Sequence, residues 1–242
     1  MLEAAFWGFV GGGALLIGAV VALRFTVRDL PLRAITAFGA GVLISAATLD
    51  LTEEAFVVGG AGIAAGGLAA GSLSFFVISR AVQRRAPKGG GSANAIVVGA
   101  ILDGIPESAA IGISLIDGSG VSTAVVVAVF LSNVPEALSS SAELRAGRSD
   151  RQVLGLWGAV AVACAAAAAL GYGALSGLGG DGLGFVNAFA AGAIITTLSD
   201  TLIPDAVRPR HQQDEGPMAD NLAMGVVVTL GFAVAALLSS PG

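Results

Sequence analysis

The sequence has little charge for its length. Only 12% of its 242 residues are Asp, Glu, Lys or Arg, whereas a soluble domain carries about 25%. Hydrophobic residues make up 55% of the chain, and the mean hydropathy is +0.86. This small number of charges cannot cover a water-exposed surface, which excludes a soluble globular protein. The high hydrophobic content excludes a disordered chain. It predicts an integral membrane protein whose surroundings are the lipid bilayer.

Cysteine and histidine are almost absent. The single Cys164 excludes a disulfide framework within the chain and a cysteine-cluster zinc site, and the single His211 excludes a multi-histidine metal site. The formal net charge of -5 argues against a nucleic-acid partner. The chain also lacks the GxxxxGK[ST] pattern of an ATP-binding loop. We therefore expect neither an enzyme nor an ATP-driven pump, and no resident cofactor.

Long apolar runs fill most of the chain. A spanning helix needs about 20 apolar residues, because each residue adds about 1.5 Å across a hydrocarbon core of about 30 Å. The sequence predicts an all-α polytopic protein, a single transmembrane domain over 1–242, with a loop at 81–94 between the third and fourth helices. Eight stretches meet the length requirement: 4–23, 34–51, 57–78, 95–116, 122–144, 153–175, 184–203 and 218–238.

The basic residues predict the topology. With eight spans, all 12 Lys and Arg residues fall in four connections on one side, and the other side has none. The positive-inside rule makes that side cytoplasmic. The expected location is the cell membrane, with both termini extracytoplasmic. The basic residues are Arg24, Arg28, Arg33, Arg80, Arg84, Arg85, Lys88, Arg145, Arg148, Arg151, Arg208 and Arg210.

Two pairs of helices resemble each other. Residues 37–56 align without gaps on 188–207, pairing Phe38 with Phe189 and Gly41 with Gly192. The fourth helix contains DGIPES and the fifth SNVPEA. Each pair runs in opposite directions across the membrane, which is typical of the inverted repeats of transporters. Chance similarity between Ala- and Gly-rich helices is the alternative.

Several carboxylates fall within the predicted helices. Asp103 and Glu107 lie in the fourth helix, Glu136 in the fifth and Asp200 in the seventh. An acidic side chain at bilayer depth costs about 2.5–3.5 kcal/mol on insertion scales. No Lys or Arg lies inside a predicted helix to pair with them, so they hold either protons or a cation.

The spacing brings polar groups of two helices together. Asp103 and Glu107 are four residues apart and share a helix face, as do Ser132 and Glu136, with Asn133 beside Ser132. A proline precedes each glutamate and frees a backbone carbonyl four residues back, at Leu102 and Leu131. Carboxylate, amide, hydroxyl and carbonyl oxygens together predict a site for a divalent cation.

At these residues the chain resembles the ZIP family of divalent metal transporters. The paired HNxPE-type motifs of that family correspond to Asp103–Glu107 and Ser132–Glu136, and the family's boxes in helices 2 and 7 correspond to 53–55 and 200–206. The resemblance implies eight helices, extracytoplasmic termini and transport of a divalent metal toward the cytoplasm. The metal ligands it implies are Asp103, Glu107, Ser132, Asn133, Glu136 and Asp200.

The sequence departs from the family pattern at the histidines. Asp103 and Ser132 replace them, Gly104 replaces the first motif's asparagine, and no acid stands near Ala165 in the sixth helix. We therefore expect one transported ion, bound mostly by oxygen, with zinc, iron and manganese all open. The expected partners are this ion and the bilayer, and a homodimer stays open. Two alternatives remain: a proton- or cation-coupled permease for another solute, and a non-transporting membrane metal sensor or scaffold.

Overall fold

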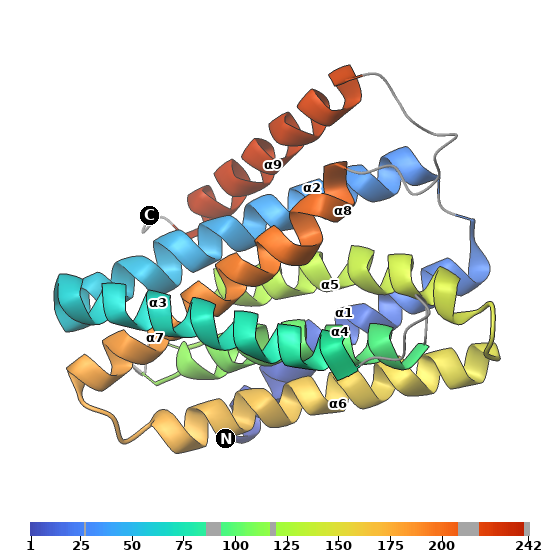
Figure 1. The fold of residues 1–242 in the computed structure, drawn as a ribbon. Coiled ribbons are helices and arrows are strands. Elements are labelled where there is room, and N and C mark those ends of the chain that lie inside the picture. Colours follow the sequence, from blue (N-terminus) through green and yellow to red (C-terminus); the bar gives the residue numbers. More distant parts are fainter. Residues whose placement is uncertain (27, 86–92, 117–119, 208–217, 240–242) are drawn as a thin grey trace.

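The computed structural model describes residues 1–26, 28–85, 93–116, 120–207 and 218–239, and within them every regular element is a helix. This confirms the predicted all-helical chain. The helices lie roughly side by side in an elongated bundle (Figure 1). They are α1 (Leu2–Arg24), α2 (Asp29–Ser45), η1 (Ala46–Thr52), α3 (Glu53–Arg85), α4 (Ala93–Ile113), α5 (Thr123–Leu144), α6 (Asp150–Leu175), α7 (Gly180–Thr197), η2 (Leu198–Leu202), α8 (Ile203–Val207) and α9 (Met218–Ser239).

Six segments of the described chain are long and apolar enough to cross a membrane, which supports a membrane protein. One of them, Asp29–Val82, has 54 residues, and at about 1.5 Å per residue a straight helix of that length would far exceed a bilayer core. Gly60 interrupts it with φ 75° and ψ 170°, a conformation that only glycine adopts without strain. The chain reverses there and α3 runs back along α7 (Figure 1). The six are Leu2–Arg24, Asp29–Val82, Thr123–Leu144, Asp150–Leu175, Gly180–Val207 and Leu222–Ser239.

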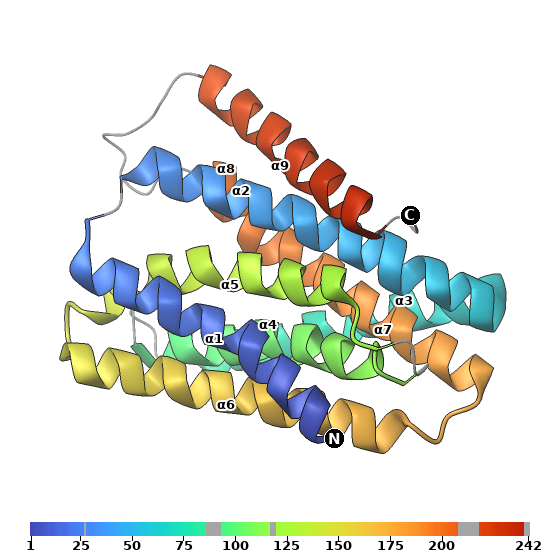
Figure 2. The same ribbon diagram turned by 180° about the vertical axis from the view of Figure 1, so that it is seen from behind.

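The helices pack as two groups. In one, α1 packs against α5 and α6, and α4 packs against α6. In the other, α3 packs along α7, and α2 packs along α9. The two groups meet where α2 contacts α5 and α4 contacts α7 (Figures 1 and 2). The largest apolar cluster lies at this junction, with buried residues from α2, η1, α4, α5 and α7.

Close contacts in the second group depend on glycine. Gly41 of α2 and Gly231 of α9 each face the other helix so closely that a Cβ would overlap a backbone carbonyl oxygen. Gly192 of α7 and Gly71 of α3 make the same reciprocal contact. Small residues of this kind let helix backbones approach closely in lipid. Gly41 and Gly192 are also paired in the sequence alignment, so the two helix pairs pack in the same way.

Two π-helical segments occur at matching places. The segment η1 continues α2, and η2 continues α7. In the ungapped alignment, residues 198–202 of η2 correspond to 47–51, which lie inside η1. π-Helical turns are rare and often mark functional sites.

Two helix boundaries correct the sequence prediction. The loop expected at 81–94 is shorter, since α3 extends to Arg85 and α4 begins at Ala93. The second helix begins at Asp29 rather than at 34, so Arg33 lies inside α2 and is 3% exposed. The prediction that no Lys or Arg lies in a helix core is therefore wrong at Arg33, whereas Arg24, Arg80, Arg84, Arg85 and Arg151 lie in the end turns of their helices. Lys88, Arg208, Arg210 and His211 lie outside the described residues.

Candidate cation site

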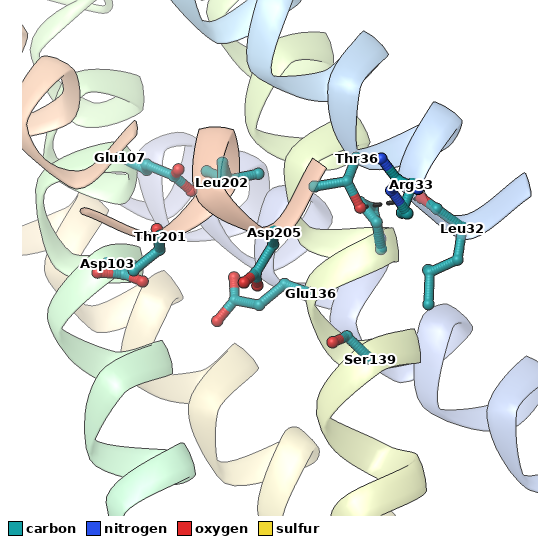
Figure 3. Close-up of a pocket in the computed structure, with 11 residues that line it drawn as sticks. Leu32, Arg33, Thr36, Asp103, Glu107, Glu136, Ser139, Thr201, Leu202 and Asp205 are labelled. Carbon is teal, nitrogen blue, oxygen red and sulfur yellow. Dashed lines mark hydrogen bonds between the residues drawn. The ribbon is translucent and has the colours of Figure 1, made fainter. Parts of the chain in front are cut away.

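A cavity of about 40 Å³ lies where α2, α4, α5 and the η2–α8 segment meet. This volume is large enough for a cation with one or more water molecules. Figure 3 shows polar and charged side chains of all four segments turned toward it. The lining residues are Leu32, Arg33, Thr36, Asp103, Glu107, Pro135, Glu136, Ser139, Thr201, Leu202 and Asp205.

Four of the lining residues are carboxylates. Asp103 and Glu107 come from α4, Glu136 from α5 and Asp205 from α8. Glu107 is buried, with 3% exposure; Asp103 and Glu136 are half-buried; Asp205 is exposed. The acidic groups therefore extend from the closed end of the cavity at Glu107 to its open end at Asp205 (Figure 3).

Helical spacing explains which acids reach the cavity. Asp103 and Glu107 share a face of α4, as predicted. Thr201 of η2 and Asp205 of α8, four residues apart, also reach the cavity together. Asp200 lies close enough to Asp103 to repel its carboxylate, but it does not line the cavity. It is exposed and lines a separate pocket with Ser79 and Arg80 of α3.

Two predicted ligands in α5 have other contacts. The Ser132 hydroxyl donates to the Val129 carbonyl oxygen at 3.0 Å, and its side chain also lies beside Glu107. The Asn133 Nδ2 donates to the Gly11 carbonyl oxygen of α1 at 3.0 Å. Both residues are almost fully buried. Neither lines the cavity, so their roles as ligands remain predictions.

The carbonyl freed by Pro135 has a specific neighbour. A Cβ on Gly39 of α2 would lie 3.0 Å from the Leu131 carbonyl oxygen. The oxygen therefore faces the α2 backbone, where weak Cα–H···O contacts are common between helices. The prediction that this carbonyl faces the site needs this correction. Leu102, the residue whose carbonyl is freed by Pro106, lines an apolar groove between α3, α4 and α7.

Arg33 places a positive charge in the cavity wall. Its Nε donates to the Ala206 carbonyl oxygen at 3.0 Å, and its Nη2 donates to the Val207 carbonyl oxygen at 2.9 Å. Its Nη1 lies 3.9 Å from an Asp29 carboxylate oxygen. Cations near a helix C-terminus bond to its last carbonyls and interact favourably with its dipole. Arg33 thus fastens the end of α8 to α2 beside the carboxylates.

Cys164 of α6 fills the space beside Gly104. A Cβ on Gly104 would lie 3.1 Å from the Cys164 sulfur. The motif position that lacks a side chain in α4 is thus covered by a buried thiol. Cys164 therefore has a packing role between α6 and α4.

Sequence reasoning missed five of the lining polar residues: Arg33, Thr36, Ser139, Thr201 and Asp205. For Asp205 a signal was present, since it belongs to the 200–206 box of the seventh helix. The sequence did not indicate that Arg33 lies in the second helix, because Arg33 precedes the apolar run from which that helix was predicted. Within the described residues, no three His, Cys, Asp or Glu side chains are close enough together to hold a metal ion. The cavity carboxylates would therefore have to move closer together to coordinate one ion.

Comparison with known proteins gives no family: no family model and no curated protein matches the chain.

Proposed function

We propose that the protein is a permease that carries divalent metal ions across a membrane, as its resemblance to the ZIP family implies. The observation that carries the proposal is the set of four carboxylates around one cavity inside an apolar helix bundle. The metal is the transported substrate. Glu107 and Glu136 are its central ligands, and Asp103 takes the place of a histidine.

Electrostatics favours a cation as the occupant. Four ionised carboxylates and one guanidinium leave a formal charge of -3 around a small cavity. At low dielectric, this repulsion is relieved only by protons or by a bound cation. Oxygen ligands suit divalent ions such as manganese, and they also accept iron and zinc.

The proposal includes eight spans in two inverted repeats. The break at Gly60 divides the 54-residue segment in two, and α4 supplies a further helix of 21 residues. The matching π-helical segments and reciprocal glycine contacts support a repeat that relates α2 to α7 and α3 to α9. Such repeats let one central site face either side of the membrane in turn.

Sidedness and direction follow from the basic residues. Arg24, Arg85 and Arg145 lie at or next to the helix ends nearest the open end of the cavity. We assign this end to the cytoplasm by the positive-inside rule. The cavity then opens to the cytoplasm, and the central apolar cluster closes the other side. Net transport toward the cytoplasm is the expected direction.

Flux into proteoliposomes tests this function. Purified protein should carry Mn²⁺ or Zn²⁺ down its gradient, and Glu107→Gln and Glu136→Gln should each remove most of the flux. Each substitution keeps the side-chain shape but removes the charge. Glu143→Gln is the matched control, because Glu143 is exposed near the end of the same helix as Glu136. It should leave the flux unchanged.

The outcomes separate the alternatives. Wild-type flux in both cavity variants would refute the site. Protein that binds Mn²⁺, as seen by protection against thermal unfolding, but carries no flux would indicate a sensor or scaffold. Protein with neither metal binding nor metal flux would favour a permease for another solute, with the carboxylates as proton carriers.

A further inference from the structure

The polar side chain of Asn187 in α7 is buried, and its hydrogen-bonding groups are unsatisfied within the part of the chain that the structure describes. It is 1% exposed, and among the described residues neither its Nδ2 nor its Oδ1 has a hydrogen-bond partner. A buried polar group without a partner costs about 1–3 kcal/mol, so such groups call for an explanation. Asn187 lies far along α7 from the cavity, on the side of the protein that is closed.

The helix face that carries Asn187 leads to the cavity. Ala191, Ile194 and Leu198 follow at helical spacing and are buried in the central apolar cluster. At Leu198 the π-helical η2 begins, and Thr201 and Asp205 of η2 and α8 line the cavity. The segment formed by α7, η2 and α8 is therefore polar at both ends, at Asn187 and at the cavity, with buried apolar residues between them.

Along the corresponding face of α2 the two polar ends come in the reverse order: the cavity residue comes first and the residue on the closed side comes last. One position before the aligned residues, Asn187 corresponds to Thr36, which lines the cavity. Within the alignment, Thr201 corresponds to Asp50 of η1. Between Thr36 and Asp50, the buried Ala40, Leu43 and Ala47 belong to the same apolar cluster. The cavity residues Thr36 and Thr201 thus have counterparts, Asn187 and Asp50, on the closed side. These two lie on elements in contact, since η1 packs against α7.

Asp50 has the partial burial expected of a residue at the edge of a closed site. Its carboxylate is half-buried and accepts a 3.2 Å hydrogen bond from the Ser239 hydroxyl of α9. An amide and a carboxylate supply oxygen ligands of the kind that divalent cations bind.

We infer that Asn187 and Asp50 form an outer cation site, the counterpart of the inner cavity, which opens to the extracytoplasmic side and is closed in this structure. The inference rests on the proposed function for the identity of the cation. In the open state the Asn187 amide oxygen and the Asp50 carboxylate contact the incoming ion. Closure of the apolar cluster then leaves the amide without partners.

Cysteine accessibility tests the outer opening without any flux assay. Since Cys164 is the only cysteine, Cys164→Ser provides the background for Asn187→Cys in sealed vesicles. A membrane-impermeant thiol reagent added from the extracytoplasmic side should label Asn187→Cys, and Mn²⁺ should slow the labelling. Ala188→Cys is the matched control: Ala188 is fully buried, adjacent in sequence, and packs on α3 at Gly67. It should not react.

Flux then tests the contact with the ion. Asn187→Ala and Asp50→Asn should each raise the KM for Mn²⁺ by about three- to tenfold, the effect of losing one polar contact. Asn187→Asp should restore the KM of the unmodified protein. If Asn187→Ala does not fold, Asn187→Thr, which introduces the residue type found at the counterpart position, replaces it in the test.

Each result is decisive. Equal labelling of Asn187→Cys and Ala188→Cys would overturn the outer site even if wild-type flux is normal. Labelling that Mn²⁺ does not slow, or an unchanged KM, would overturn the ion contact. Absence of wild-type flux would refute the metal permease, whereas labelling of Asn187→Cys would still support the outer opening.

Discussion

The guanidinium of Arg33 donates a 3.0 Å hydrogen bond to the backbone carbonyl of Ala206, a residue 173 positions away. The bond joins the beginning of α2 to the end of α8 next to Asp205, at the open end of the cavity (Figure 3). The positive charge of this buried guanidinium reduces the repulsion among the nearby carboxylates without lying between them. Arg33 is therefore both a structural tether and a local counter-charge.

Replacing Arg33 should destabilise the fold. Arg33→Gln removes hydrogen bonds from a charged donor to two buried carbonyls, and we expect a loss of about 2–4 kcal/mol in the free energy of unfolding. Thermal unfolding in detergent measures it. Asp150→Asn serves as control, since it removes only an ion pair with Arg145 at 3.5 Å that is about half exposed, and its loss should cost at most about 1 kcal/mol. Equal effects of both substitutions would contradict the tether.

Asp205 and Asp200 should differ in function. Asp205→Asn removes a carboxylate from the cavity, so it should lower the apparent affinity for Mn²⁺ by about tenfold, the equivalent of about 1.4 kcal/mol. Asp200→Asn changes an exposed group that lines a separate pocket, so it should have a smaller effect. Concentration dependence of flux distinguishes them. A larger effect at Asp200 would favour the site predicted from the sequence.

Lower pH should weaken metal binding. The carboxylates must be deprotonated to bind the ion, so protons compete with it. The affinity for Mn²⁺ should fall toward acidic pH by about tenfold per pH unit for each carboxyl that must lose a proton. Calorimetric titration at neutral and mildly acidic pH measures this. An affinity that stays constant would show that the carboxylates are not the ligands.

Metal preference should reflect the missing histidines. With oxygen ligands, we expect one bound ion and no strong preference for zinc over manganese. Asp103→His should shift the competition toward zinc, because Asp103 lines the cavity and imidazole favours zinc. Competition titration and the metal-to-protein ratio test both points. Two bound ions, or strong zinc selectivity in the unmodified protein, would contradict the prediction.

Topology can be tested at two exposed glycines. Gly147 follows α5, and Gly179 precedes α7, so the 26-residue α6 separates them. If α6 crosses the membrane, Gly147→Cys should be labelled from the cytoplasmic side and Gly179→Cys from the other, both in the Cys164→Ser background. Labelling of both from one side would overturn the proposed eight spans.

Part of the fold and site followed from the sequence alone. Apolar runs of spanning length predicted the helices because burial in lipid requires continuous apolar surface and internal backbone hydrogen bonding. The four-residue spacing placed Asp103 beside Glu107 because helical geometry is local. The paired motifs also predicted that Glu136 of α5 lies near them, and the cavity brings all three together.

The rest depended on tertiary packing. Polar helix ends give no apolar signal, so the sequence could not show that α2 begins at Asp29 and buries Arg33, or that α8 carries Asp205 to the cavity. Asp200 looked equivalent to Asp205 because rotation around a helix becomes meaningful only once its neighbours are known. The partners of Arg33 and the isolation of Asn187 are set by contacts between distant helices. Local sequence thus determined the helices and their spacing, and packing between them decided which charges share one cavity.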